Sequence, residues 1–466
     1  MEPRPLKYIA EATAGELRHG LPDTAVSRIC VDSRQAQPGD LFFALAGERF
    51  DAHSFLPEVA KRGVTAFVAE RSKIPAGFQG CAVIAVDSTR AALGRLGAHY
   101  RRDFTLPVTA VGGSNGKTTT KELIASVLRQ KLAALWSESS FNNEIGVPLT
   151  LLNLEHSHQA AVLEAGTNHP GELAPLLHMM APIFGVVTNI GREHLEFFGD
   201  LPGVAREEGA MAEALPPEGA LFVNGDNPWT ETIVRRCRAR VVRVGFGESN
   251  DWMARNIRVD DCCATFSVEG RQSDFNGDYH IKLLGRHQVA NALFALAVGA
   301  ELGLNRAAIE HGLAICAPAK MRLQLCHPGG IRVLDDAYNA NADSMLAALQ
   351  TLNDFPCAGR RVAVLGGMAE LGESSQAAHA EVGRCAAEFH LDQLFTVGRE
   401  AGEIALAARR GGLQTVVEIP EVEMAIRAVR DFARPGDVVL IKASRAMRLE
   451  RITEALKTNL EMNPRH

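Results

Sequence analysis

The fold of this chain is decided by the stretch Pro107-Val-Thr-Ala-Val-Gly-Gly-Ser-Asn-Gly-Lys-Thr-Thr-Thr-Lys-Glu122. The β-branched run from Val108 to Val111 predicts a strand, and the apolar spacing between Leu123 and Leu128 predicts a helix. A glycine-containing loop joins them. Backbone N–H groups of such a loop, and of the helix N-terminus that follows it, can surround a phosphate. The stretch therefore predicts a binding site for a nucleoside triphosphate.

The loop follows the pattern Gly113-x-x-Gly116-Lys117-Thr118. It is shorter than the eight-residue P-loop, which would need a glycine at the position of Val111. Lys117 would bring positive charge to the phosphates, and Thr118 would offer its hydroxyl to Mg²⁺. A glycine turn with a solvated lysine is the alternative interpretation.

Length and composition indicate a soluble protein of several domains. A chain of 466 residues predicts roughly three domains. Its hydrophobic fraction of 46% and charged fraction of 22% are typical of globular proteins. With a net charge of −6 and no basic run interleaved with aromatics, we expect no nucleic-acid partner.

The cysteines and the apolar segments predict a cytoplasmic location. The nine cysteines include no Cys-x-x-Cys pair, so we expect reduced thiols. The first seven residues contain no apolar signal core. The longest weakly polar stretch, Val289 to Ala300, is shorter than the roughly 20 residues that span a bilayer. We expect no membrane span.

Strand-like and helix-like runs alternate along the chain and predict three α/β domains. We expect a small α/β N-terminal domain over residues 1–104, with a helix capped at Asp87-Ser88 near its end. A central domain with a parallel sheet and the phosphate loop would follow over 105–317. Strand patterns from Ile331 onward predict a Rossmann-like C-terminal domain over 318–466.

Two further polar groups follow predicted strands of the central domain. Glu164 ends the run that begins at Ala160, and His194 follows the run from Phe184 to Ile190. Ligands of open parallel sheets bind beyond the carboxyl ends of the strands, so both side chains could meet the phosphates bound near Lys117. Glu164 is the better Mg²⁺ ligand, because that ion prefers oxygen. A capping carboxylate and a solvated loop histidine are the alternatives.

Other polar residues leave their roles open. Asn142 and its neighbour Asn143 could donate to phosphate oxygens or cap a helix. Asn291 begins an apolar helix and fits a ligand or a backbone-capping role equally well. In the first domain, Ser33 and Arg34 follow a strand and could bind a phosphate through the guanidinium fork. A surface turn with a salt bridge is the alternative for that pair.

Taken together, the motifs resemble those of the Mur ligases along the whole chain. The resemblance rests on Gly113-Ser-Asn-Gly-Lys-Thr-Thr119, Ser140-Phe-Asn-Asn143, Glu164-Ala-Gly-Thr-Asn-His-Pro-Gly-Glu172, Thr188-Asn-Ile-Gly191 with His194, Asn291-Ala292, Met321-Arg322 and Asp335-Asp-Ala-Tyr-Asn-Ala-Asn341. Asp32-Ser-Arg34, Gly47-Glu-Arg49 and Val364-Leu-Gly-Gly-Met-Ala-Glu-Leu-Gly372 look like the branch that adds D-alanyl-D-alanine.

The resemblance implies an ATP-dependent ligase that joins D-alanyl-D-alanine to UDP-N-acetylmuramoyl-tripeptide through an acyl phosphate, in peptidoglycan precursor synthesis. It implies Mg²⁺ as cofactor and a monomer as the working form. The residues implied to bind ATP are Gly113, Ser114, Asn115, Gly116, Lys117, Thr118, Thr119, Asn291, Arg322 and Asp336. Those implied for the other substrates are Ser33, Arg34, Asn142, Tyr338 and Asn339. Lys117, Glu164 and His194 would be catalytic, with Thr118, Glu164 and His194 as metal ligands.

Two positions depart from the family pattern. The family's proline after the asparagine is lost in Asn341-Ala342-Asp343, with no obvious chemical loss. Glu208 stands where the family has a carbamylated lysine that helps to bind a second magnesium ion. We hypothesise that Glu208 supports that ion through water, and a solvated helix residue is the alternative.

Two rival functions fit part of the sequence. A folylpolyglutamate synthetase shares the acyl phosphate chemistry and resembles the middle domain, but would not require the N-terminal domain with Asp32-Ser-Arg34. A nucleotide-dependent switch protein would use the same loop and would hydrolyse ATP without the two peptide substrates.

Overall fold

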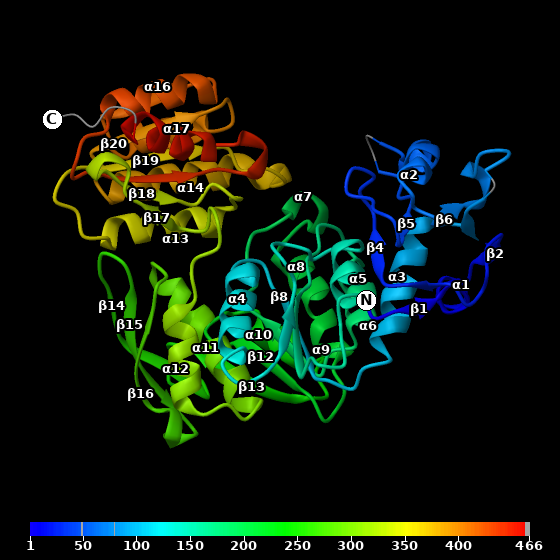
Figure 1. Ribbon diagram of the computed structural model, residues 1–466. Coiled ribbons are helices and arrows are strands. Elements are labelled where there is room, and N and C mark those ends of the chain that lie inside the picture. Colours follow the sequence, from blue (N-terminus) through cyan, green and yellow to red (C-terminus); the bar gives the residue numbers. More distant parts are fainter. Residues whose placement is uncertain (48–49, 79, 462–466) are drawn as a thin grey trace.

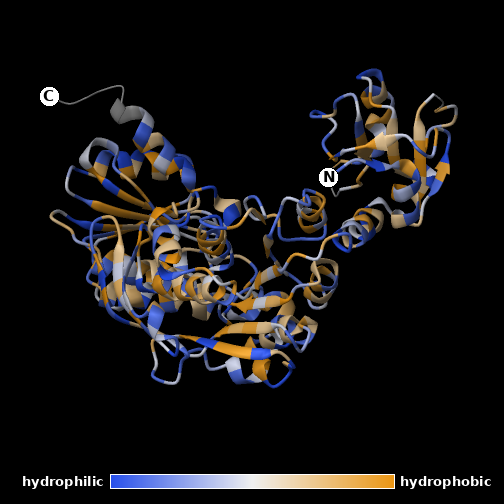
Figure 2. Ribbon diagram, turned by 60° about the horizontal axis from the view of Figure 1, so that its bottom comes forward, coloured by the Kyte–Doolittle hydropathy of each residue, from blue (hydrophilic) through white to orange (hydrophobic). Residues whose placement is uncertain are grey.

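Three α/β domains make up the protein, as the sequence predicts. The computed structural model describes residues 1–47, 50–78 and 80–461, so Glu48 and Arg49 of the resemblance motif lie outside the described residues. Each domain contains its own main sheet. Figure 1 shows the first domain and the C-terminal domain attached to different parts of the central domain. Figure 2 shows hydrophobic residues concentrated along the strands inside each domain.

The first domain is built on a sheet with the strand order β2-β7-β6-β5-β4, beside a small β1-β3 pair. Only the β2–β7 pairing of the main sheet is antiparallel. The strands are β1 Arg4–Pro5, β2 Glu16–Arg18, β3 Ala25–Val26, β4 Arg28–Cys30, β5 Asp40–Phe43, β6 Ala66–Glu70 and β7 Ala82–Val86. The helices are α1 Leu6–Thr13, α2 Leu56–Lys61 and α3 Thr89–Arg101.

Helix α3 attaches the first domain to the central one. Ser88 caps this helix by accepting a hydrogen bond from the Ala91 N–H, which confirms the predicted helix start. Near its C-terminal end, the Tyr100 hydroxyl donates to the Leu154 carbonyl at 2.8 Å. The next residue, Arg101, donates to the Met180 carbonyl at 3.0 Å. The buried end of α3 is thereby bonded to the backbone of the central domain.

The central domain contains a sheet with the order β16-β15-β14-β13-β12-β11-β8-β10-β9. Its strands are β8 Val108–Gly112, β9 Ala134–Trp136, β10 Ala160–Glu164, β11 Phe184–Val187, β12 Ala220–Asn224, β13 Arg240–Gly245, β14 Trp252–Val259, β15 Ala264–Gly270 and β16 Gly277–Ile281. Strands β8 to β14 pair in parallel, whereas β14, β15 and β16 pair antiparallel. The sheet is therefore mixed, and the antiparallel extension adds to the parallel sheet that the sequence predicts.

Helices cover both faces of this sheet. They are α4 Lys117–Leu128, α5 Gly146–Leu151, α6 Leu173–Met180, α7 Leu195–Phe198, α8 Leu201–Glu208, α9 Ala210–Ala214, α10 Thr230–Val234, α11 Arg286–Glu301 and α12 Arg306–Ile315. Apolar side chains of α4, α11 and α12 share one core cluster. Those of α5, α6 and α9 share another, which continues into the first domain. The apolar periodicity that predicts α4 thus reflects real burial.

The C-terminal domain contains a sheet with the order β17-β18-β22-β19-β20-β21, parallel except for β17–β18. The strands are β17 Gln324–Cys326, β18 Arg332–Asp335, β19 Arg361–Gly366, β20 Gln393–Val397, β21 Val416–Ile419 and β22 Val438–Lys442. The helices are α13 Ala342–Asp354, α14 Ser375–Glu388, α15 Gly402–Arg410, α16 Val422–Phe432 and α17 Glu450–Glu461. Throughout the described part of the chain, no helix is both long and apolar enough to cross a membrane.

Candidate active site

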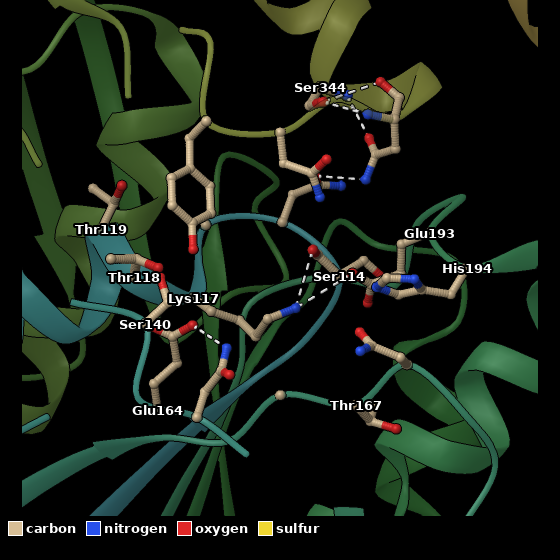
Figure 3. Close-up of a pocket in the computed structure, with 18 of the residues that line it drawn as sticks. Ser114, Lys117, Thr118, Thr119, Ser140, Glu164, Thr167, Glu193, His194 and Ser344 are labelled. Atoms are coloured by element: carbon tan, nitrogen blue, oxygen red, sulfur yellow. Dashed lines mark hydrogen bonds and ion pairs between the residues drawn. The ribbon is translucent and has the colours of Figure 1, made fainter. Parts of the chain in front are cut away.

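A cavity of about 930 Å³ lies between the central and C-terminal domains. Strands β10, β8 and β11 are neighbours and parallel, so their carboxyl ends meet at one edge of the central sheet. From that edge come the phosphate loop, Glu164 and His194, and all three line the cavity. The C-terminal domain supplies lining residues from 322–348 and from Lys442. Figure 3 shows Lys117, Glu164 and His194 around this space, with Ser344 of the C-terminal domain on its far side.

The phosphate loop is held in place by the segment that follows β11. Gly113 and Gly116 have φ values of 102° and 88°, a backbone conformation that side chains disfavour. A Cβ on Gly116 would also approach the Asn291 side-chain oxygen to 2.6 Å. The Asn115 N–H donates to the Asn189 side chain at 2.8 Å, and the Ser114 hydroxyl accepts from the Gly191 N–H at 2.8 Å. The loop is thus bonded to the segment 189–191.

Lys117 is the first residue of α4, and its ammonium group lies among oxygens. It donates to the Gly113 carbonyl at 2.6 Å and lies 3.3 Å from a carboxylate oxygen of Glu193. Burial by itself would lower the pKa of Lys117, but the carboxylates of Glu193, Glu208 and Glu164 outweigh that effect and raise it. Lys117 therefore remains charged.

Glu164 is the last residue of β10 and is almost fully buried. One carboxylate oxygen accepts a hydrogen bond from the Asn142 amide at 2.8 Å. Its other oxygen is buried and has no hydrogen-bond partner among the described residues. A buried acceptor without a partner costs free energy, and a bound cation would remove that cost. Glu164 therefore fits a Mg²⁺ ligand, and Asn142 orients it.

The asparagine beside Asn142 has a different position. The Asn143 side-chain oxygen accepts from the N–H groups of Ile145 and Gly146, at the start of α5. The Asn143 side chain therefore stabilises the start of this helix. Asn142 and Asn143 both line the cavity, and Asn142 lies beside Glu164.

His194 lies at the edge of the cavity in a strained conformation. Its φ of 49° is unusual for a residue other than glycine. The Nδ1 atom lies 2.5 Å from a carboxylate oxygen of Glu370, in the C-terminal domain. This contact orients the imidazole and leaves Nε2 as the nitrogen available to a ligand.

Glu208 is not the solvated residue that the sequence left as an alternative. It ends helix α8 with 1% of its surface exposed. One carboxylate oxygen accepts from the Gly113 N–H at 2.8 Å, and the other has no partner among the described residues. Burial raises the pKa of Glu208 to about 8, although Lys117 acts in the opposite direction. The Glu208 side chain therefore stabilises the phosphate loop through its hydrogen bond with the Gly113 N–H.

Arg322 and Asp336 extend the lining on the side of the C-terminal domain. The Arg322 guanidinium lies 4.0 Å from the centre of the Tyr338 ring and contacts the Thr118 hydroxyl at 3.4 Å. Asp336 forms a 2.6 Å ion pair with Lys442, which also donates to the Asn339 carbonyl. Asn291 on α11 donates to the Gln288 side chain. Together these contacts form the outer wall of the cavity.

The predicted phosphate-binding pair of the first domain lies elsewhere. Ser33 and Arg34 are in the turn that follows β4, and neither lines the cavity. The exposed Arg34 side chain pairs with Asp32 at 2.7 Å. A salt bridge of this kind is the surface-turn arrangement that the sequence leaves open, and an exposed guanidinium can exchange partners cheaply.

Sequence reasoning missed two charged residues of the cavity. Lys442 ends β22, and its place after a predicted strand could have identified it. Glu193 lies between Arg192 and His194 in a loop, where no periodicity indicates which side chain faces inward. Its carboxylate is 7% exposed and contacts Lys117.

Family comparisons match most of the chain. The Mur ligase middle domain matches residues 111–299, and the Mur ligase glutamate ligase domain matches residues 321–445. The catalytic domain of the Mur ligase family matches residues 25–101. These three matches correspond to the three sheets described above.

Individual relatives cover nearly the whole length. The UDP-N-acetylmuramoyl-tripeptide--D-alanyl-D-alanine ligase of Bacillus subtilis is 34% identical, over 97% of this chain and 98% of its own. The crystal structure of MurF from Acinetobacter baumannii is 33% identical, covers 98% of this chain and 99% of its own, and has a TM-score of 0.89. MurF ligase from Thermotoga maritima, solved in complex with ADP, is 28% identical over 94% of this chain and 98% of its own, with a TM-score of 0.82.

Proposed function

This chain belongs to the Mur ligase family, and from that premise we propose that it joins D-alanyl-D-alanine to UDP-N-acetylmuramoyl-tripeptide at the expense of ATP. The observation that carries the proposal is the similarity along the whole chain to ligases with that activity, together with Lys117 and Glu164 at one interdomain cavity. The product is a precursor of peptidoglycan. We place the reaction in the cytoplasm and assign it to a monomer.

The phosphates of ATP would bind at the loop 113–119. Backbone N–H groups at the start of α4 point to this place, and the Lys117 ammonium supplies the charge that the transferring phosphate needs. Arg322, Asp336 and Asn291 would contact the rest of the nucleotide. Arg322 and Asp336 lie in or near the C-terminal domain, so the site is complete only when the two domains are docked.

Mg²⁺ fits the oxygen-rich side of the cavity. Glu164 has an unpartnered buried oxygen, and the Thr118 hydroxyl and His194 line the same cavity. Thr118 and Glu164 would hold one ion, and His194 would help to hold a second one that Glu208 supports through water. The ion supplies positive charge that screens the phosphate oxygens from the attacking carboxylate. Asn142 would keep Glu164 oriented throughout.

The reaction requires two anions to meet. The tripeptide carboxylate attacks the γ-phosphorus of ATP, which gives an acyl phosphate and ADP. The amine of D-alanyl-D-alanine then attacks the acyl carbon, which forms the amide and releases phosphate. Lys117 would offset the charge that repels the carboxylate from ATP, and that charge matters most in the transition state. Tyr338 and Asn339 would contact the substrates from the C-terminal domain.

Each of the three domains would bind a different part of the substrates. We propose boundaries at 104 and 317, which leave each main sheet within one domain. Residues 1–104 would bind the UDP group, with Ser33 and Arg34 at its phosphates. Residues 105–317 would bind ATP, and residues 318–466 would bind the acceptor and complete the nucleotide site.

Phosphate release tests this function. The ligase should release phosphate only when ATP, the UDP-muramoyl tripeptide and D-alanyl-D-alanine are all present. A switch protein would hydrolyse ATP without the peptide substrates, and a folylpolyglutamate synthetase would require a folate and glutamate instead. Dependence on both peptide substrates therefore supports the proposal, and phosphate release without them contradicts it.

A further inference from the structure

Four consecutive residues, 191–194, lie between the phosphate loop and the C-terminal domain. Each has a partner on one side or the other. The contacts are Gly191 with Ser114, Arg192 with Asp343 and Glu381, Glu193 with Lys117, and His194 with Glu370. The phosphate-loop partners and the C-terminal-domain partners alternate along the segment. A displacement of the phosphate loop or of the C-terminal domain would therefore displace segment 191–194 as well.

Arg192 binds two acidic residues of the C-terminal domain. Its backbone N–H donates to Asp343 at 2.7 Å, and its guanidinium pairs with the same carboxylate at 2.6 Å. The guanidinium also pairs with Glu381 on α14 at 2.5 Å. Asp343 stands in the first turn of α13. The C-terminal domain thus binds both the backbone and the side chain of Arg192.

Glu193 contacts Lys117, the first residue of α4. Its carboxylate is buried, with one oxygen 3.3 Å from the Lys117 ammonium. The other oxygen has no hydrogen-bond partner among the described residues. A carboxylate with this little solvent interacts strongly with its partner, so its position influences where the ammonium group lies.

We propose that segment 191–194 couples docking of the C-terminal domain to the position of Lys117. Asp343 and Glu381 fix Arg192, and Glu193, one peptide bond away, fixes the Lys117 ammonium. This inference rests on the proposed ligase function. Arg192 and Glu193 are positioning residues in it. A displacement of about 1 Å at a reacting group can reduce the rate roughly a hundredfold. A small shift of this segment, which would move the Lys117 ammonium, would therefore lower kcat.

A second interdomain ion pair provides the matched control. Arg332 on β18 pairs with Asp261, in the turn after β14, at 3.1 Å. This pair also joins the C-terminal and central domains, but neither residue lines the cavity. If Arg192 only adds attraction between the two domains, removing the Asp261 charge should change kcat as much as removing the Arg192 charge does.

The test compares Asp343→Asn, Arg192→Gln, Glu193→Gln and Asp261→Asn in the full chain. We expect the first three to lower kcat about tenfold, with the KM of the UDP-substrate changed less than about twofold, and Asp261→Asn to leave kcat within about twofold. Arg192→Gln combined with Glu193→Gln should lose little more than either alone, because both act through Lys117. Multiplicative losses, or an equal loss in Asp261→Asn, would overturn the coupling.

A binding measurement separates this inference from the ligase function. Calorimetry with a non-hydrolysable ATP analogue and Mg²⁺ should show weaker binding in Asp343→Asn and Glu193→Gln than in the wild type, with thermal unfolding as the check on folding. Tighter binding by Glu193→Gln would mean that Glu193 competes with phosphate for Lys117, which would overturn the proposal. This binding measurement remains valid even if the wild type joins other substrates. A failure of the coupling proposal can therefore be distinguished from a failure of the proposed ligase function.

Discussion

The carboxylate of Glu208 accepts a hydrogen bond from the backbone N–H of Gly113 at 2.8 Å, beneath the phosphate loop. These residues are 95 positions apart. A Cβ on the neighbouring Gly112 would lie only 2.9 Å from the same oxygen, so the loop leaves no space between itself and this side chain. Glu208 is therefore a direct support of the loop.

Glu208 also carries the first prediction. If its carboxylate supports a second magnesium ion, Glu208→Ala should lower turnover and raise the Mg²⁺ concentration needed for half-maximal rate. Because glutamate needs no carbon dioxide to carry its carboxylate, the wild type should not respond to bicarbonate in carbonate-free buffer. Steady-state rates across a Mg²⁺ titration test both points. Strong activation by bicarbonate, or an alanine variant with unchanged rate and Mg²⁺ dependence, would reject the role.

A second prediction concerns pH and stability at the same residue. Burial raises the pKa of Glu208 to about 8 from its ordinary value of 4.5, so the folded state retains a proton that the unfolded chain has lost. The wild type should therefore lose stability, relative to Glu208→Gln, as the pH rises from about 5 to about 8. The glutamine can still accept from the Gly113 N–H. Thermal unfolding without Mg²⁺ should show a Tm difference in favour of the variant that grows over this range. A constant difference would contradict the pKa shift.

Lys117 carries the third prediction. Lys117→Ala should lower kcat about a hundredfold or more, because the charge acts mainly on the transition state of phosphoryl transfer. Circular dichroism should show an intact fold, since the side chain contributes mostly charge. The matched control is Lys131, an exposed residue in the turn that follows helix α4, where alanine should leave turnover unchanged. A Lys117→Ala protein with near-normal turnover would remove the basis for the proposed site.

Glu164 gives the fourth prediction. Glu164→Gln keeps the size of the side chain and its hydrogen bond to Asn142 but removes the charge that a cation requires. Turnover should fall and should recover in part when Mg²⁺ is raised. Isothermal titration of Mg²⁺ in the presence of the ATP analogue should show weaker binding of the metal. Unchanged metal affinity would assign Glu164 a structural role only.

Arg34 gives the fifth prediction. Its exposed guanidinium, paired with Asp32, could exchange that partner for the UDP phosphates. Arg34→Ala should then raise the KM for the UDP-tripeptide much more than the KM for ATP, with kcat little changed, because the contact is remote from the reacting atoms. Arg18, a surface arginine of the same domain paired with Glu16, serves as the control. Equal changes in both Michaelis constants would contradict a separate UDP site.

Much of the site follows from local sequence. The strand, glycine loop and helix around Lys117 depend on residues close together in the chain, so their pattern predicts β8 and α4 directly. The Ser88 cap of α3 is local for the same reason. Glu164 follows from one rule of topology, because the carboxyl ends of parallel strands share an edge.

The antiparallel strands β15 and β16 and the positions of the loop charges do not follow from such patterns. Segment 191–194 has no periodicity that tells which side chains face the phosphate loop and which face the C-terminal domain. The sequence does not indicate a role for Asp343, yet in the structure Asp343 binds Arg192.

The sequence by itself determined the strand, glycine loop and helix around Lys117, the three α/β domains and the sheet edge at which we propose that ligands bind. Tertiary structure alone decided that Glu208 is buried beneath the loop, that Glu193 holds Lys117 and that Arg192 reaches Asp343. The physical reason is the range of the interactions. Helices, caps and strands are stabilised by neighbours a few residues away, whereas the partners of these charges lie 95, 76 and 151 positions distant, and only the packing of whole domains brings them together.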